Sequence, residues 1–507
     1  MKKDFKILLF YPNPPQMGPA PGNLAILSAC LKQDGFDVKL FDCTIYKPPN
    51  TETNDDVREK LGHVKKSNID NYFIAKHVDI YEDFVKTVEE YKPNLIGFTI
   101  VDMTTDFSLS FMEKIKDKKI PIIVGGVGAT FNYKRMFNSN LIDYVCISEG
   151  EGALVELCNK LYNNENTSNI KNIYTKNENG DIIKNPLRPL VDINKLPTPD
   201  FSIYEYFRFY RPYFGNVVRM MGIDTDRGCP GDCTFCAAPS LRRLAKEYNC
   251  GNVYRFKSFD KVFEEAKELI EKHDINFIFL SAESFLSMPL KKLEEFAERY
   301  KKEIQLPFYT QSRLDSFTEE KTKILAEMGC KSIGVGLEHG SEKIRYNLLN
   351  KRITNKQILD GFKELAKYIS IVPGIHNMIG LPDETREDIF ETIKLNREVS
   401  QILNGRHTLN VFTFMPFTGT RLREMCIKKG YITGNEDIPY SWFKYTLLNM
   451  PSISKKELHG LEKTFVLYVF LPESYWPEIE IAEQDDKEGE QMFNKLMKMK
   501  NEEFTKI

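Results

Sequence analysis

The sequence lacks several features that would place it directly in a class of proteins. It contains no run of 18 apolar residues, so we expect no transmembrane segment. Its first apolar stretch, FKILLFYP, is too short for a secretory signal peptide and has no small-residue cleavage site. We therefore expect a cytoplasmic protein that begins with a buried strand. A net charge of −2 argues against affinity for nucleic acid that rests on bulk charge, and we expect no such partner.

Cysteine is sparse, and ten cysteines in 507 residues exclude a disulfide scaffold. Seven are scattered, and we interpret each as a small buried hydrophobic residue. The scattered cysteines are Cys30, Cys43, Cys146, Cys158, Cys250, Cys330 and Cys426. The other three, Cys229, Cys233 and Cys236, lie close together in the segment RGCPGDCTFCAAP. Their spacing, C-x3-C-x2-C, has no fourth cysteine.

The length predicts two or three domains. In the first part of the chain, near-continuous apolar segments alternate with helical ones, which predicts a parallel sheet covered on both faces. The expected strands are 6–12, 37–43, 94–100, 120–126 and 142–148. A polar insertion over 47–80 is expected to be partly helical, and the segment NIYTKNENGDIIKN is expected to form a hairpin.

The alternation restarts near residue 218, with six expected strands separated by helices. Six β/α units with right-handed crossovers predict a partial (β/α)6 barrel of the TIM type. The resulting domain boundaries are 1–160 for the first α/β domain, 161–215 for a connector, 216–425 for the barrel and 426–507 for a helical capping region. Two aromatic segments of that last region, SYWPEIE and YSWFKY, could cover a pocket or belong to the core.

Loops after the strands of the first domain are rich in glycine and proline. Ligands of such sheets bind beyond the carboxyl ends of the strands, where glycine lets the backbone approach a ligand. The same glycines could simply form tight turns. This part of the chain has no G-x-G-x-x-G, so an ordinary dinucleotide fingerprint is missing.

Three kinds of site compete for the clustered cysteines. A structural zinc site would need a fourth ligand, and no suitable Cys or His is near in sequence. A disulfide would leave one thiol over. A [4Fe–4S] cluster held by three thiolates would leave one iron open to a small molecule. The position of the cysteines at the carboxyl mouth of the expected barrel favours the cluster.

The segment CPGDCTFC resembles the signature of the radical S-adenosylmethionine (SAM) superfamily. This resemblance implies that Cys229, Cys233 and Cys236 hold the cluster, that SAM binds its open iron, and that reductive cleavage of SAM yields a 5′-deoxyadenosyl radical. Phe235 would pack near the adenine, Glu283 would accept from the ammonium, Glu338 would hold the ribose and Arg345 would pair with the carboxylate. The full set of implied SAM contacts is Phe235, Glu283, Arg313, Glu338, Ser341, Arg345, Gly374 and His376.

The front of the chain resembles the Rossmann- or flavodoxin-like domain of cobalamin-binding radical SAM proteins, through segments such as IPIIVGGVGAT and IDYVCISEGEGALVEL. The D-x-H-x-x-G motif is absent and no histidine precedes His63, so the resemblance implies base-off cobalamin without a histidine ligand. A vestigial domain that only shapes the pocket is the alternative. The implied cobalamin contacts are Pro15, Gly18, Thr99, Val101, Gly125, Gly126, Gly128, Glu149 and Gly150.

The resemblance implies a cobalamin-dependent radical SAM C-methyltransferase acting on an unactivated carbon. The alternative is an enzyme of the same architecture that catalyses cyclisation, C–C bond formation or oxidation without methyl transfer. A regulatory iron–sulfur module is a third and weaker reading, and the lack of a second three-cysteine set disfavours a methylthiotransferase. We expect an external electron donor, a flavodoxin or ferredoxin. The substrate would be a peptide, a lipid or a natural-product intermediate.

Overall fold

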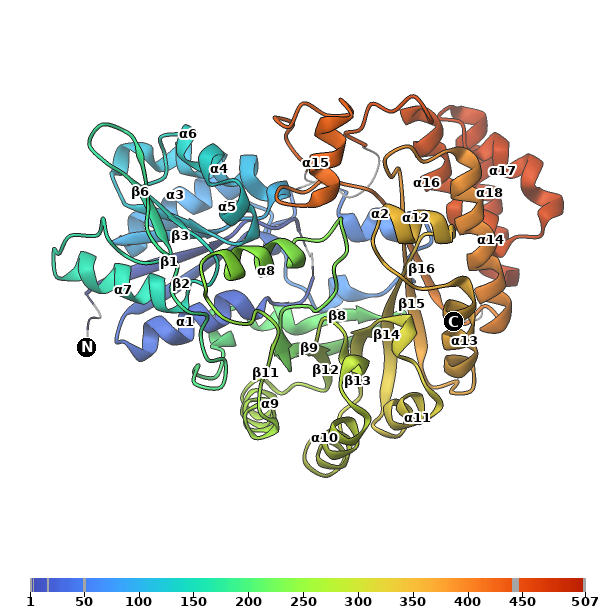
Figure 1. Ribbon diagram of the computed structural model, residues 1–507, viewed down its shortest axis with the longest axis horizontal. Coiled ribbons are helices and arrows are strands. Elements are labelled where there is room, and N and C mark those ends of the chain that lie inside the picture. Colours follow the sequence, from blue (N-terminus) through green and yellow to red (C-terminus); the bar gives the residue numbers. More distant parts are fainter. Residues whose placement is uncertain (1, 3, 16–17, 49–51, 440–445, 505–507) are drawn as a thin grey trace.

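The computed structural model describes residues 2, 4–15, 18–48, 52–439 and 446–504. It contains two seven-stranded sheets, each with its own helices, and a group of C-terminal helices (Figure 1). The expected α/β architecture of two successive sheets is confirmed. No described helix is both long enough and apolar enough to span a bilayer.

The first sheet has the strand order β2-β1-β3-β4-β5-β6-β7. Its five parallel strands are those expected from the sequence. Alternate residues of β1 enter two different cores: Ile7 and Leu9 pack with the side of α1 and α7, while Leu8 and Phe10 pack with the side of α3 and α4. The elements are β1 (Lys6–Tyr11), α1 (Gly22–Gln33), β2 (Asp37–Asp42), α3 (Ile80–Tyr91), β3 (Leu95–Thr99), α4 (Thr105–Ile115), β4 (Ile122–Gly125), α5 (Val127–Phe131), α6 (Tyr133–Asn138), β5 (Tyr144–Cys146) and α7 (Glu151–Tyr162).

The expected hairpin forms and extends this sheet. Strand β6 (Ile173–Lys176) pairs antiparallel with β5, and β7 (Ile182–Lys184) pairs antiparallel with β6. Part of the segment expected as a connector is therefore hydrogen-bonded to the first sheet.

The second sheet has the order β16-β15-β14-β13-β12-β9-β8 and forms a curled half-barrel (Figure 1). Six strands are parallel, as expected, while β8 is an unexpected antiparallel strand at one edge. Strands β16 and β8 form the two edges, so no strand among the described residues closes the half-barrel on its remaining side. The elements are β8 (Tyr210–Tyr213), β9 (Asn216–Asp224), α8 (Ala238–Glu247), α9 (Phe259–His273), β12 (Phe277–Ser281), α10 (Leu290–Glu303), β13 (Phe308–Ser312), α11 (Glu319–Glu327), β14 (Cys330–Glu338), α12 (Glu342–Asn347), α13 (Asn355–Ala366), β15 (Val372–Ile379), α14 (Arg386–Ile402), β16 (Thr408–Thr413) and α15 (Arg421–Lys428).

The C-terminal helices α16 (Lys455–Phe470), α17 (Trp476–Ala482) and α18 (Lys487–Met499) pack beside α14 and β16. Trp476 of the SYWPEIE segment contacts Phe390 and Tyr468, with ring centroids 5.5 and 5.6 Å away. These contacts favour the core alternative for this segment, and its role as a pocket cover stays a prediction. The YSWFKY segment, 440–445, lies outside the described residues.

The polar insertion crosses from the first sheet to the open side of the half-barrel. Its helix α2 (Asn54–Lys60) lies near β16 in Figure 1. Arg58 of α2 donates to the Asn410 side chain of β16 at 3.1 Å, and Lys60 forms a 3.0 Å ion pair with Glu490 of α18. Val57 and Leu61 enter the core that includes the C-terminal helices. We call residues 52–78 the strap.

Candidate active site between the two sheets

The three clustered cysteines lie on the loop that follows β9, at the carboxyl end of the half-barrel. The Gly231 N–H donates to Cys229 Sγ at 3.3 Å, and the Ala238 N–H donates to Cys236 Sγ at 3.4 Å. All three thiols are partly exposed, whereas six of the seven scattered cysteines are buried. The seventh, Cys30, is half-buried.

The loop is held by contacts from outside its own sequence. Thr234 donates its N–H to Leu349 O at 3.0 Å and its hydroxyl to Leu348 O at 2.5 Å. Gly228 has a φ of +88°, and a side chain there would meet the carbonyl of Val253. The loop is therefore fixed by residues that follow β14 and by a close approach that only glycine allows.

The electrostatics of the loop suit an iron–sulfur cluster. Burial raises the pKa of all three thiols, that of Cys233 to about 11, so thiolates need compensating charge. The side chains of Arg313 and Lys351 act electrostatically to lower the pKa of Cys233, and backbone N–H groups supply hydrogen bonds to sulfur. Among the residues described, no three His, Cys, Asp or Glu side chains are grouped to hold a single metal ion.

Several of the expected SAM contacts surround this loop. Arg313 is near the cysteines, and its guanidinium is held by Asp315 at 2.6 Å. Glu338 pairs with Lys351, with 2.8 Å between Oε1 and Nζ. Phe235 packs against the small apolar core that contains Leu349 and Phe414. Glu283 is exposed at the end of β12, and the half-buried Ser341 precedes α12.

Arg345 is not brought to this site. Its side chain is fully buried, and its guanidinium donates to the carbonyls of His339, Gly340 and Ile353 and to the side chain of Asn355. These contacts favour a role in fixing the turn after β14 over the expected contact with the SAM carboxylate. Gly374 and His376 line a different cavity, on the concave side of the sheet toward the amino ends of the strands.

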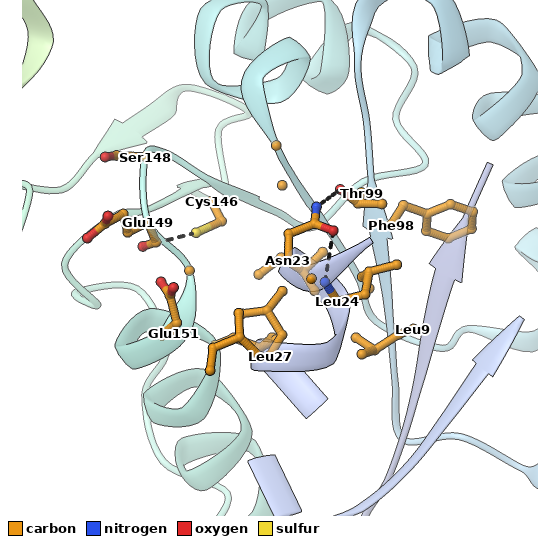
Figure 2. Close-up of a pocket in the computed structure, with 18 of the residues that line it drawn as sticks. Leu9, Asn23, Leu24, Leu27, Phe98, Thr99, Cys146, Ser148, Glu149 and Glu151 are labelled. Atoms are coloured by element: carbon orange, nitrogen blue, oxygen red, sulfur yellow. Dashed lines mark hydrogen bonds between the residues drawn. The ribbon is translucent and has the colours of Figure 1, made fainter. Parts of the chain in front are cut away.

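Two neighbouring cavities, of about 300 and 530 Å³, lie at the carboxyl edge of the first sheet. Both are lined by Gly22, Asn23, Thr99 and Asp224. Figure 2 shows the smaller one, where Asn23 Nδ2 donates to Thr99 Oγ1 at 3.4 Å and Leu27 and Cys146 contribute apolar surface. Asp224 belongs to β9, so these cavities are bounded by both domains.

Most of the expected cobalamin contacts border these cavities. Thr99 lines both, Gly125, Gly126, Glu149 and Gly150 line the smaller and Val101 lines the larger. Val101 is an exposed apolar side chain, 40% accessible. Gly128 is buried, while Pro15 and Gly18 are not among the residues that line either cavity.

Two of these glycines have a packing role that the sequence did not indicate. A Cβ on Gly126 would lie 2.6 Å from Ile100 O, and one on Gly128 would lie 2.8 Å from the Val101 carbonyl carbon. The loop after β4 is therefore pressed against the loop after β3. At these two positions glycine is explained by backbone contact inside the protein, and no ligand is needed to explain it.

Glu149 connects the two domains through ion pairs. Its carboxylate pairs with Arg255 and, at 3.0 Å, with Arg227 of the second domain. Nearby cations hold its pKa below the usual range against the effect of burial. Glu151 accepts from Arg227 at 2.7 Å. Glu149 and Glu151 thus both bind Arg227, which directly precedes the cysteine loop.

Sequence reasoning missed Asp224, Asp226 and Arg227. Asp224 faces the shared wall of the cavities, and Asp226 is half-buried with an Oδ1 that lacks a hydrogen-bond partner. Burial and the nearby Glu283 and Asp224 raise the pKa of Asp226 to about 7. The sequence feature that could have indicated them is the segment D-x-D-R at 224–227, which directly precedes the cysteine loop.

Two family models match separate regions of the chain. Residues 224–395 match the Radical SAM superfamily model, and residues 19–158 match the B12 binding domain model. The two matched regions carry the cysteine loop and the first sheet with its cavities, respectively.

Three curated relatives are similar to this chain in sequence. An uncharacterized methyltransferase of Pyrococcus horikoshii is 27% identical over 73% of this chain and 76% of that protein. The cytidylyl-2-hydroxyethylphosphonate methyltransferase of Streptomyces wedmorensis is 21% identical over 85% of this chain and 82% of that protein. The anaerobic magnesium-protoporphyrin IX monomethyl ester cyclase of Rubrivivax gelatinosus is 24% identical over 63% and 57%.

Two solved structures share the fold. The cobalamin-dependent S-adenosylmethionine radical enzyme OxsB aligns over 98% of this chain and 71% of its own, with a TM-score of 0.64 and 15% identity. The radical S-adenosylmethionine methyltransferase TsrM from Kitasatospora setae aligns over 83% and 76%, with a TM-score of 0.60 and 18% identity.

Proposed function

Because the chain is a radical SAM enzyme with an N-terminal B12 binding domain, we propose that it is a cobalamin-dependent C-methyltransferase acting on an unactivated carbon. The observation that carries this proposal is the wall shared by the two domains. Asp224 lines the cavities of the B12 binding domain and lies five residues before Cys229 on the same strand–loop segment. The methyltransferase relatives support methyl transfer as the outcome.

The chain's own residues would hold three cofactors. Cys229, Cys233 and Cys236 would hold the [4Fe–4S] cluster, Glu338 and Arg313 would contact SAM, and the loops after β1, β3, β4 and β5 would hold cobalamin. When bound, the cluster and SAM supply a deoxyadenosyl radical and cobalamin supplies the methyl group. The protein contributes proximity, because a carbon radical must meet the methyl group before it is quenched.

The proposed methyl transfer has a defined stoichiometry. One substrate C–H, two SAM cations and two electrons give the methylated product, S-adenosylhomocysteine, 5′-deoxyadenosine and methionine. The electrons require an external donor, for which we propose a flavodoxin or ferredoxin. The residues described around the two cavities include no histidine, which supports base-off cobalamin. We propose a cytoplasmic location, where such reductants are available.

A cyclase relative keeps a second candidate open. An enzyme of this architecture that closes a ring or oxidises carbon would cleave SAM to deoxyadenosine without transferring its methyl group. The same two domains and the same cysteine loop would serve either reaction.

The two candidates differ in the fate of the SAM methyl group. Anaerobically reconstituted protein would be incubated with cobalamin, methyl-deuterated SAM and a strong reductant. We expect S-adenosylhomocysteine and deuterated methylcobalamin in amounts that follow the bound cobalamin, with cobalamin-free protein as the control. Formation of deoxyadenosine without S-adenosylhomocysteine would exclude the methyltransferase.

A further inference from the structure

A short segment after β16 contacts both domains, and we call its residues 415–422 the bridge. It lies where α5, α8 and α15 meet (Figure 1). The hydroxyl of Ser240, on α8, donates to the carbonyl of Gly419. A Cβ on Gly419 would lie 2.4 Å from the ring of Phe131, the last residue of α5. The bridge is thus packed against a helix of each domain.

The bridge holds the cysteine loop through two of its residues. The N–H of Leu422 donates to the carbonyl of Thr234 at 3.0 Å. The guanidinium of Arg421 donates to the carbonyl of Asp232 and forms an ion pair with its side chain, with 3.0 Å between Nη2 and Oδ2. These contacts fix the part of the loop that contains Cys233, because Asp232 and Thr234 are its two neighbours.

Asp102, which follows β3 in the B12 binding domain, holds the bridge from the other domain. Its Oδ2 accepts from the backbone N–H of Thr418 at 2.5 Å. Asp102 is 8% exposed, and its Oδ1 is buried with no hydrogen-bond partner among the described residues. Burial raises the pKa of this carboxyl above its ordinary value, and the bonds from Thr418 act in the opposite sense. A carboxylate buried in this way depends on the bonds that it does make.

The turn that carries Asp102 forms part of the larger cavity of the first sheet. Val101, Met103 and Thr104 line that cavity, whereas Asp102 lines neither of the two. Met103 also packs with Met415 of the bridge in a small apolar core. Asp102 therefore lies between the cavity wall and the bridge, and it can act on a ligand in the cavity only through its neighbours.

Internal hydrogen bonds hold the bridge in one shape. The hydroxyl of Thr420 donates to the carbonyl of Phe417 at 2.7 Å, and the N–H of Thr420 donates to the same carbonyl at 3.2 Å. Arg423, on α15, donates to the carbonyl of Pro416 at 2.7 Å. A segment closed by such bonds can pass a displacement from one end to the other, because its ends cannot move independently.

We propose that Asp102 is a positioning residue, which sets the separation between the cobalamin site and the cysteine loop through the bridge. This inference rests on the proposed function for the identity of the two sites, but the mechanical link does not depend on methyl transfer. The path runs from Asp102 to Thr418, along the bridge to Leu422, and from there to Thr234. Precise separation matters because a misplacement of about 1 Å between reacting groups can cost about 100-fold in rate.

Hydrogen–deuterium exchange of the cofactor-free, full-length protein tests the mechanical link. Asp102→Ala removes the acceptor of the Thr418 N–H, and we expect the amides of the bridge and of the cysteine loop to exchange at least tenfold faster. Asp102→Asn keeps an oxygen that can accept from Thr418 and should restore the wild-type rates. Asp106→Ala is the control: its side chain is 51% exposed and pairs with Arg135, and the rates in both segments should stay unchanged.

A second variant disturbs the bridge at another contact, so that the test does not depend on the folding of Asp102→Ala. A methyl group in Gly419→Ala would meet the ring of Phe131, and we expect the same faster exchange in the cysteine loop. Gly430→Ala shares a positive φ but has no atom within 4 Å of the added carbon, so it controls for backbone strain. Faster exchange that stays within residues 101–105 and the bridge, with the cysteine loop unchanged in both variants, would overturn the proposal.

The separation itself can be measured in the reconstituted protein. Pulsed electron paramagnetic resonance would give the distance between cob(II)alamin and the reduced cluster. We expect one narrow distance distribution in the wild type and in Asp102→Asn, and a longer or broader one in Asp102→Ala and Gly419→Ala. An unchanged distribution in both disturbed variants would contradict the positioning role. Failure to bind cobalamin, with the exchange effects intact, would count against the proposed function alone.

Discussion

Arg227 Nη1 lies 2.7 Å from Glu151 Oε1, and this ion pair joins the cysteine loop to the first turn of α7 in the B12 binding domain. Glu151 is 7% exposed at its side chain and Arg227 is 33% exposed. This contact fixes the start of the cysteine loop relative to the helix that borders the smaller cavity of the first sheet.

Replacing Arg227 with glutamine should destabilise the protein by about 2 kcal/mol. The loss leaves the buried Glu151 without its cation, and the partial exposure of Arg227 reduces the cost relative to a fully buried pair. Urea unfolding would measure it, with Lys195→Gln of an exposed pair as control. Unchanged stability and unchanged cobalamin retention would show that the pair has no coupling role.

Alanine at Cys229, Cys233 or Cys236 should abolish iron binding and the formation of deoxyadenosine. Three thiolates are the minimum that the proposed cluster needs from this loop. Iron and sulfide analysis after anaerobic reconstitution would measure the loss. Cys158→Ala, at a buried cysteine far from the loop in sequence, should keep full iron content, and equal loss there would contradict the assignment.

Asp226→Asn should stabilise the protein at pH 8 and have little effect at pH 4. The folded-state pKa of about 7 lies above the ordinary aspartate value of 3.8. The unfolded chain therefore releases this proton first, and stability falls as pH rises from about 4 to about 7. The gain in the variant should be on the order of 2–4 kcal/mol. Urea unfolding at both pH values would reveal it, and an equal effect at both would disprove the pKa shift.

Glu338→Gln should weaken SAM binding by about 10- to 100-fold, because the proposed ribose acceptor loses its charge and its ion pair with Lys351. Equilibrium dialysis of reconstituted protein with labelled SAM would measure the change. Glu327→Gln, on the exposed side of α11, is the matched control. Normal SAM affinity in Glu338→Gln would move the ribose contact to another residue.

Gly126→Ala should destabilise the protein by at least about 2 kcal/mol and reduce cobalamin retention. Gly126 has a φ of +102°, and a methyl group would meet Ile100 O. Gly180→Ala shares a positive φ but has no atom within 4 Å of the added carbon, so it isolates the backbone cost of about 1 kcal/mol. Equal losses in the two variants would show that the loop contact is unimportant.

Much of the fold followed from local patterns in the sequence. The five parallel strands of the first sheet and the six of the second were predicted because each is an apolar segment bounded by turns and followed by an amphipathic helix. Strand β8 was missed because YRPY has no apolar run and pairs only through its neighbour β9. The hairpin was predicted, but its pairing with β5 is a contact between distant segments.

The candidate site also had parts that the sequence predicted and parts that it did not. The spacing of Cys229, Cys233 and Cys236 indicated an iron–sulfur cluster without any structure, because the motif is contained in eight residues. The motif after β14 indicated Arg345 as a SAM contact, yet the structure buries that guanidinium among backbone carbonyls. A motif specifies residue type, whereas the direction of a side chain depends on what packs around it.

The sequence alone determined the two successive runs of alternating strands and helices and the three clustered thiols, since these depend on short-range periodicity and spacing. Only the tertiary structure decided that Asp224 borders the cavities of the B12 binding domain and that Arg58 crosses to β16. These relationships join residues up to 352 positions apart. They arise because two sheets and a strap must bury their apolar surfaces together, which no local pattern specifies.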